Sequence, residues 1–99
     1  MSFKVRYTSA AREDLRRLFG FLAERDLQAA QSARSAIAEA GQLLQQFPFT
    51  CRKANDENPF LRELLIPFGS AGYVALFEIE NNDTVTILAL RHQREDDYH

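Results

Sequence analysis

The sequence predicts an α+β domain of two layers, in which a helical hairpin packs on a mainly antiparallel four-stranded sheet. Two observations carry this prediction. Residues 10–48 contain two segments whose apolar residues recur at spacings of three and four, and residues 60–90 contain three extended apolar runs separated by two turn signals. With a short strand in front, the expected order is β-α-α-β-β-β, and the length predicts a single domain, residues 1–99.

The first strand and the first helix are read from the first 25 residues. Phe3, Val5 and Tyr7 alternate with charged residues, which is the two-residue period of a half-buried strand. Thr8 or Ser9 supplies an N-cap oxygen to the helix that follows. One helical stripe holds its apolar side chains: Ala11, Leu15, Leu18, Phe19 and Leu22.

Three further features of this helix bear on its surroundings. Gly20 predicts a close packing contact, since glycine in a helix costs about 1 kcal/mol relative to alanine. Phe21 points about 160° away from Phe19 and is expected to be an exposed contact residue, with burial of the helix on two sides as the alternative. The three basic residues beside the apolar stripe are expected to form a solvated face: Arg12, Arg16 and Arg17.

The second helix has a clear start and a clear end. Asp26 can cap it and Pro48 closes it. The short connection to the first helix predicts an antiparallel hairpin. Its buried seam is expected to comprise Ala30, Ala33, Ile37, Ala40, Leu44 and Phe47.

The C-terminal half is expected to form a meander of three strands. Residues 49–59 are polar and predict a surface loop, followed by strands over residues 60–66, 73–80 and 84–90. Pro67 and Gly69 predict a turn between the first two of these strands, and residues 81–83 a tight turn between the last two.

The bulk composition narrows the class of protein. The net charge is −2, with a basic excess in residues 1–54 and an acidic excess in residues 55–99, which argues against wrapping of nucleic acid. No apolar run approaches the roughly 20 residues that span a bilayer, and the polar N-terminus predicts no export. The single cysteine, Cys51, is expected to be a loop thiol in a reducing cytoplasm. No metal or cofactor site is expected.

Five phrases of the chain, in order, resemble the ParE/RelE superfamily of toxins from bacterial type II toxin–antitoxin systems. They are AREDL at residues 11–15, LQQFP at 44–48, LREL at 61–64, YV at 73–74 and HQR at 92–94. The resemblance covers most of the chain and implies a toxin bound by a cognate antitoxin, with a toxin–antitoxin hetero-oligomer as a further expectation. ParE-like members are inhibitors of DNA gyrase, whereas RelE-like members cut mRNA on the ribosome.

An mRNA endoribonuclease would need an acid, a base and cations for the phosphate. The candidates for these roles are His92, Arg62, Arg94 and Tyr98, with Arg91 and His99 as further basic or titratable groups. Val74 stands where an arginine is usual after the tyrosine, and residues 95–97 are acidic, which would repel a phosphate backbone. The ParE-like interpretation is therefore preferred. It has no catalytic residue.

The preferred interpretation needs a contact surface for the target or the antitoxin. The candidates are Arg62, Tyr73, Arg91, His92, Arg94 and Phe21. Besides Phe21, two of them have alternatives that the sequence leaves open. His92 can be a structural residue at the end of a strand, and Arg62 can pair with a carboxylate of this domain or of a partner instead of facing an open groove. A non-toxic family member that only binds its antitoxin is a third possibility.

Overall fold

A computed structural model describes residues 2–95, 97 and 98. Within these residues the elements follow the order expected from the sequence, with two additions before the meander. They are β1 (Lys4–Tyr7), α1 (Ser9–Ala23), α2 (Leu27–Gln46), a 3₁₀ turn η1 (Pro48–Thr50), β2 (Arg52–Lys53), β3 (Leu61–Phe68), β4 (Ala71–Ile79) and β5 (Thr84–His92).

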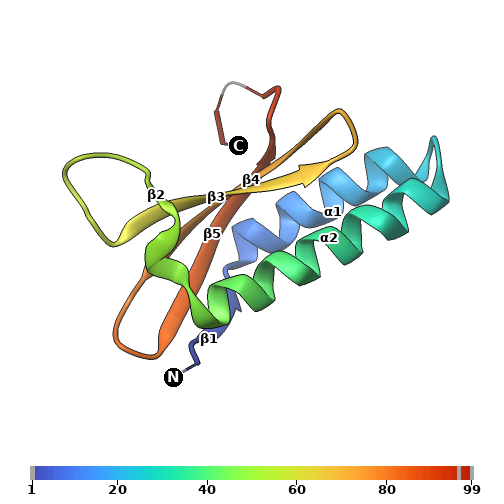
Figure 1. The fold of residues 1–99 in the computed structure, drawn as a ribbon. Helices are drawn as coiled ribbons and strands as arrows, with labels where there is room; N and C mark the ends of the chain where they lie inside the picture. The colour runs from blue at the N-terminus through green and yellow to red at the C-terminus, as the bar shows by residue number, and fades with distance from the viewer. Residues whose placement is uncertain (1, 96, 99) are drawn as a thin grey trace.

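The strands form one mixed sheet in the order β1-β5-β4-β3-β2. β1 pairs with β5 in parallel, and the other neighbours are antiparallel. Both helices lie on one face of this sheet, which confirms the two-layer α+β prediction (Figure 1).

The prediction of four strands was wrong by one short strand. Within the expected loop, Arg52 and Lys53 pair with Glu63 and Arg62 of β3. A two-residue strand is too short to show a period, so the sequence pattern could not reveal it. An ion pair between Arg52 Nη2 and Glu63 Oε1, at 3.0 Å, supports the pairing.

Pro67 was expected in a turn, but it belongs to β3 and pairs with Gly72 of β4. β2 covers β3 only at Arg62 and Glu63, so β3 is an edge strand at Pro67. An edge position tolerates the missing N–H of proline. The turn is consequently tighter than expected and uses Gly69, whose φ of 60° suits glycine.

The expected helix caps are confirmed. The Thr8 side chain accepts a hydrogen bond from Ala11 N, and Asp26 accepts from Gln28 N and Ala29 N. The expected packing contact at Gly20 is wrong, because a Cβ placed there would meet no atom within 4 Å.

The core lies between the helices and the facing side of the sheet. α1 and α2 contribute Leu18, Ala33, Ile37 and Leu44, all nearly inaccessible to solvent. The sheet contributes Leu64, Ile66, Tyr73, Ala75, Phe77, Ile79, Val85, Ile87 and Leu90. Burial of this apolar surface is the main force that holds the two layers together.

Candidate functional site

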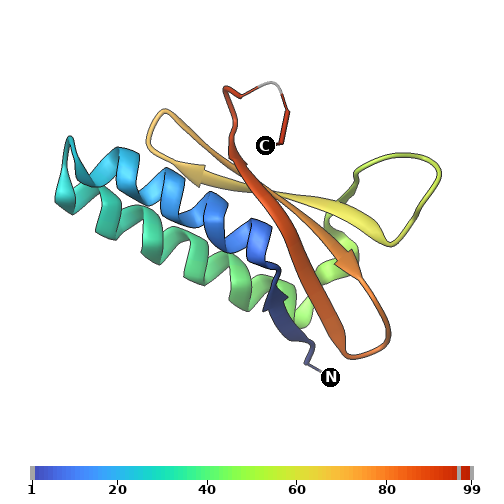
Figure 2. The same cartoon turned by 180° about the vertical axis from the view of Figure 1, so that it is seen from behind.

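A cleft of about 620 Å³ opens between α1, the β3–β4 hairpin and the end of β5. The hairpin extends over the C-terminal half of α1 in both views of the fold (Figures 1 and 2). We call this site the C-terminal cleft. Its lining residues are Arg17, Leu18, Phe21, Leu22, Phe68, Gly69, Ser70, Ala71, Tyr73, His92, Arg94 and Glu95.

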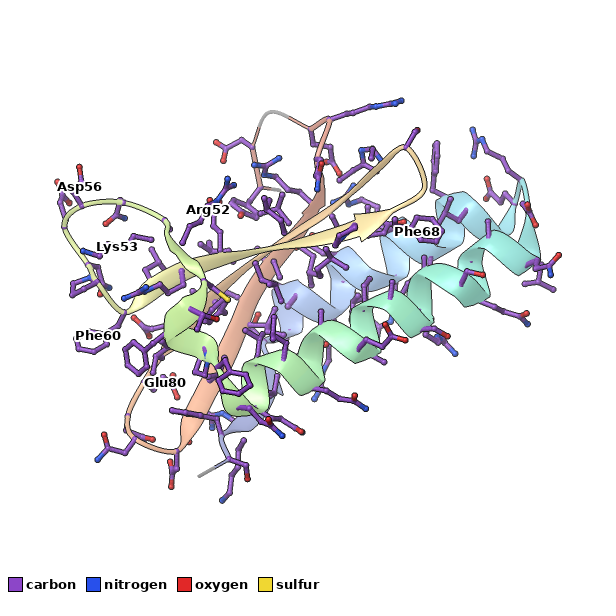
Figure 3. All side chains as sticks on the ribbon, viewed as in Figure 1. Arg52, Lys53, Asp56, Phe60, Phe68 and Glu80 are labelled. Atoms are coloured by element: carbon purple, nitrogen blue, oxygen red, sulfur yellow. The ribbon has the colours of Figure 1, made fainter. Side chains whose placement is uncertain are left out.

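Three rings form a continuous aromatic row in the cleft. Phe68 stacks on Tyr73 with a centroid separation of 5.8 Å, and His92 meets Tyr73 edge-on at 5.8 Å. Phe68 extends from the hairpin toward α1 (Figure 3). Tyr73 is 2% exposed and pairs across the sheet with both Ile66 and His92, so the register fixes its place in this row.

His92 is held by a turn that closes on itself directly after β5. Its Nδ1 accepts a hydrogen bond from Arg94 N at 3.1 Å, so in the neutral ring the proton is on Nε2. Its backbone N–H donates to Glu95 Oε1 at 2.9 Å, and Glu95 N donates to the His92 carbonyl at 3.0 Å. The imidazole therefore has a defined orientation in the cleft wall.

An ion pair ties this turn to the helix layer. Arg17 Nη1 donates to both oxygens of Glu95, at 3.1 and 3.3 Å. Arg17 Nη2 also lies 3.7 Å from Asp14 Oδ1. The pair links α1 to the end of β5 and neutralises two of the charges at the cleft.

Phe21 and Arg94 are two exposed residues of the cleft. Phe21 is 58% exposed, as expected, with the Arg25 guanidinium 3.8 Å from its ring centroid. Arg94 is exposed, and no ion pair of its side chain occurs within the described residues. An apolar wall with an available cation beside it suits recognition of another protein.

Arg91 lies on the other face of the sheet, because successive residues of a strand alternate in direction. Its guanidinium is 5.2 Å from the Tyr98 ring centroid, and its Nη1 donates to the Glu95 carbonyl at 2.7 Å. The Tyr98 hydroxyl donates to Glu63 Oε2 at 2.6 Å. Burial, together with the Glu63 carboxylate, raises the pKa of Tyr98. This tyrosine therefore stays protonated at neutral pH.

Arg62 is committed to the polypeptide backbone. Its Nε donates to the Pro59 carbonyl at 2.7 Å, and its Nη1 donates to the carbonyls of Cys51 at 2.9 Å and Phe49 at 3.2 Å. It thus ties together the two ends of the loop that runs from Phe49 to Pro59. Among the described residues no carboxylate forms an ion pair with it. Cys51, expected as a loop thiol, is buried, and its burial raises the pKa of its thiol.

The structure thus divides the candidate residues between three places. Phe21, Tyr73, His92 and Arg94 meet in the C-terminal cleft. Arg91 and Tyr98 lie on the opposite face of the sheet. Arg62 lies four residues before Ile66 on β3, and Ile66 is the residue of β3 that pairs with Tyr73 beside His92. Four residues of strand span roughly 13 Å. The set proposed for RNA cleavage is therefore dispersed, and His99 lies outside the described residues.

Sequence reasoning missed several residues of the cleft. The Arg17–Glu95 pair joins positions far apart in the chain, and no local pattern marks it. One sequence feature could have indicated Phe68: it directly precedes the glycine turn that places it over α1. No group of side chains that could bind a metal, and no helix long and apolar enough to cross a membrane, occurs in the described part of the chain.

Comparison with known proteins gives two positive results. Residues 5–97 match the family model of the ParE toxin of the type II toxin–antitoxin system, parDE. Among solved structures, the chromosomal ParDE TA system from P. aeruginosa has a chain that is 20% identical, with a TM-score of 0.70. The alignment covers 92% of this chain and 96% of that one, which shows a shared fold. No curated protein matches significantly.

The family match extends over nearly the whole chain, and a chain of the ParDE structure shares its fold. The chain therefore belongs to the ParE toxin family of type II toxin–antitoxin systems.

Proposed function

We propose that this ParE toxin inhibits DNA gyrase by binding it through the C-terminal cleft. The family supports the toxin role. The choice of gyrase as the target rests on the ParE-like features of the sequence, among them Val74 and the acidic residues 95–97. The observation that carries the proposal is the gathering of Phe21, Tyr73, His92 and Arg94 in one place.

The chemistry of the cleft supports binding more than catalysis. General acid–base cleavage of RNA needs two proton-transfer groups on opposite sides of one phosphate. Within the described residues the cleft offers one imidazole, His92, while Tyr98 lies on the other face and donates to Glu63. An exposed aromatic ring beside a free guanidinium is instead typical of a protein-binding hot spot.

The proposal includes a partner and a setting. A cognate antitoxin neutralises the toxin by forming a hetero-oligomer in the cytoplasm. Release of the toxin arrests growth by blocking replication, and on a plasmid this would favour retention of the plasmid. Antitoxin segments that fold as they bind can cover large surfaces, which suits a small target such as this domain.

Gyrase supercoiling with the purified toxin at micromolar concentration tests the proposal directly. We expect inhibition of supercoiling and accumulation of linear DNA after the gyrase is denatured. Arg94→Glu should weaken both effects, because it reverses the available charge at the cleft. Lys53→Glu is the matched control, since Lys53 is also exposed and belongs to β2, at the far side of the sheet (Figure 3).

Full supercoiling activity at micromolar wild-type toxin would count against gyrase as the target. The same preparation added to a translating extract separates the alternative. Cleavage of mRNA there, with gyrase unaffected, would move the assignment to a ribosome-dependent endoribonuclease.

A further inference from the structure

Residues 92–95, which we call the terminal turn, contribute three side chains to the C-terminal cleft: His92, Arg94 and Glu95. A segment that follows the last strand of a domain is usually poorly ordered unless other elements hold it. β5 continues beyond the end of β1, so within the described residues no strand covers the β5 edge from which the turn leaves (Figure 2). The position of Arg94 therefore depends on contacts from other parts of the fold.

Arg17 holds the terminal turn from the helix side. Two carboxylates take the place of a neighbouring strand along the uncovered edge of β5. Asp14 accepts a hydrogen bond from Leu90 N at 2.9 Å, and Glu95 Oε1 accepts one from the backbone N–H of His92, also at 2.9 Å. The Arg17 guanidinium lies 3.1 Å from Glu95 Oε1 and 3.7 Å from Asp14 Oδ1. One cation thus lies beside both carboxylates and joins the turn to α1.

Arg91 holds the same turn from the opposite face of the sheet. Its Nη1 donates to the Glu95 carbonyl at 2.7 Å and lies 3.3 and 3.4 Å from the carbonyls of His92 and Gln93. The Arg91 Nε is buried without a hydrogen-bond partner among the described residues. A buried donor without an acceptor costs free energy. The contacts with the turn, together with the Tyr98 ring 5.2 Å away, offset that cost.

The two arginines, which we call the arginine clamp, fix the backbone of the turn and leave one cation available. The backbone N–H of Arg94 donates to His92 Nδ1 at 3.1 Å, which closes the turn. The Arg94 side chain is exposed and has no ion pair within the described residues. A cation whose backbone is already held loses less conformational entropy when a partner binds it.

We propose that Arg17 and Arg91 are positioning residues for the contact with gyrase and act through Arg94. The proposal rests on the gyrase function argued above and adds the device that orients its contact surface. Arg91 was expected to touch the target or the antitoxin; in this proposal it holds the turn from behind the sheet instead. Arg94 makes the contact, and the clamp limits the orientations of the turn before binding.

A double-mutant cycle on gyrase inhibition separates positioning from direct contact. Full-length toxin is compared as wild type, Arg17→Met, Arg94→Gln and the double variant Arg17→Met/Arg94→Gln. We expect Arg17→Met to weaken inhibition about fivefold and Arg94→Gln about tenfold. The double variant should be no weaker than Arg94→Gln, because residues that act as a unit are not additive. Losses that multiply would show that Arg17 contacts the target itself and would overturn the proposal.

A second readout needs no gyrase. In nitrogen NMR spectra of the wild type, His92 should carry its proton on Nε2, because Nδ1 accepts from Arg94 N. Arg17→Met and Arg91→Met should mix in the other tautomer and accelerate amide exchange at Arg94. Folded variants, verified by thermal melting, that leave both signals unchanged would overturn the proposal. Arg17→Met keeps the test valid if Arg91→Met fails to fold.

Arg16→Met is the matched control for both readouts. Arg16 precedes Arg17 on α1 and forms an ion pair with Glu13. It borders a separate groove between α1 and α2, together with Arg12 and Arg34, and does not line the C-terminal cleft. This variant should inhibit gyrase like the wild type and keep the wild-type signals of His92 and Arg94. Equal effects of Arg16→Met and Arg17→Met would refute the clamp.

The two readouts also separate this inference from the gyrase proposal. Wild-type toxin without effect on gyrase would overturn the gyrase proposal and, with it, the contact assigned to Arg94. The ring and exchange signals would still decide whether the clamp holds the terminal turn. Inhibition by the wild type with multiplying losses in the cycle would instead retain gyrase as the target and remove the positioning role of Arg17.

Discussion

Asp14 on α1 accepts a hydrogen bond from the backbone N–H of Leu90 on β5, at 2.9 Å. β1 pairs with β5 only as far as Tyr7 and Ile87, so the rest of that β5 edge faces the helix instead of a strand. The Thr8 hydroxyl donates to the Leu88 carbonyl at 3.1 Å on the same edge. Side chains from the start of α1 thus replace a neighbouring strand and join the helix layer to the sheet.

Asp14→Ala should destabilise the fold by about 2 kcal/mol, because it leaves the buried Leu90 N–H without an acceptor. Asp14 is 5% exposed, so water cannot easily take its place. Urea unfolding provides the measurement. Asp14→Asn keeps an acceptor oxygen and should lose less stability; equal losses for the two variants would contradict a hydrogen-bonding role.

Two glycines should respond in opposite directions to alanine. Gly72→Ala would place a Cβ against the Ile66 carbonyl oxygen and should destabilise by about 1–3 kcal/mol, as overpacking does. Gly20→Ala meets no atom within 4 Å and should stabilise α1 by about 0.5–1 kcal/mol. Thermal melting of the two variants would refute this account if both shifted in the same direction.

Tyr98 should make stability fall at high pH. Its pKa is raised in the folded state by burial first and by Glu63 second, so folding favours the protonated phenol. The stabilisation that comes from this raised pKa is fully present below the pKa of tyrosine in the unfolded chain, about 10, and is lost as the pH rises above that pKa. Tyr98→Phe should cost about 1 kcal/mol at neutral pH through the lost hydrogen bond to Glu63.

The same substitution should flatten the decline of stability above about pH 10. Unfolding free energies at neutral and alkaline pH check this, with the wild type as the reference. Burial also raises the pKa of Tyr7 and Tyr73, so part of the decline should persist in the variant. A decline as steep as that of the wild type would show that Tyr98 is not its source.

Phe21→Ala should weaken gyrase inhibition at least about tenfold, because truncating an aromatic anchor removes a typical hot spot. Phe47→Ala is the matched control. Phe47 was expected in the buried seam of α2 but, at the C-cap, is 52% exposed, against 58% for Phe21, and it lies outside the cleft. Supercoiling titrations compare the two. Equal inhibition by both variants would remove Phe21 from the contact surface.

Arg62→Ala should loosen the segment 54–60 and cost about 2 kcal/mol, because three backbone carbonyls lose a charged donor. Amide hydrogen exchange should accelerate in this segment, while the core of β4 keeps its protection. Lys53→Ala serves as the control. Unchanged exchange in residues 54–60 would show that Arg62 does not fasten the segment.

Much of the fold could be predicted because its signals are local. The apolar period of α1 and α2, the caps Thr8 and Asp26, and the alternation of β1 each depend on residues close in the chain. The fifth strand was not predicted, because Arg52 and Lys53 form a strand only through their pairing with β3. The position of Pro67 within a strand was not predicted, because a sheet tolerates proline there only at an edge.

The candidate site could be predicted only in part. Phe21 was singled out from its direction on the helix, and His92 and Arg94 from their position at the end of the last strand. Which candidates lie on which face of the sheet depends on strand register. A shift of one residue in register would move each side chain of the strand to the other face. The partners of Arg62 depend on the path of a loop that folds against it.

The two layers and the order of the main elements follow from periodicity and capping, which are properties of neighbouring residues, and the family follows from short phrases of the chain. That Phe21 shares a cleft with His92, that Arg17 joins Glu95 and that the helix arginines border a groove became known from the folded domain. These relationships join residues distant in the chain. The packing of helices on the sheet brings them together, and no local pattern encodes that packing.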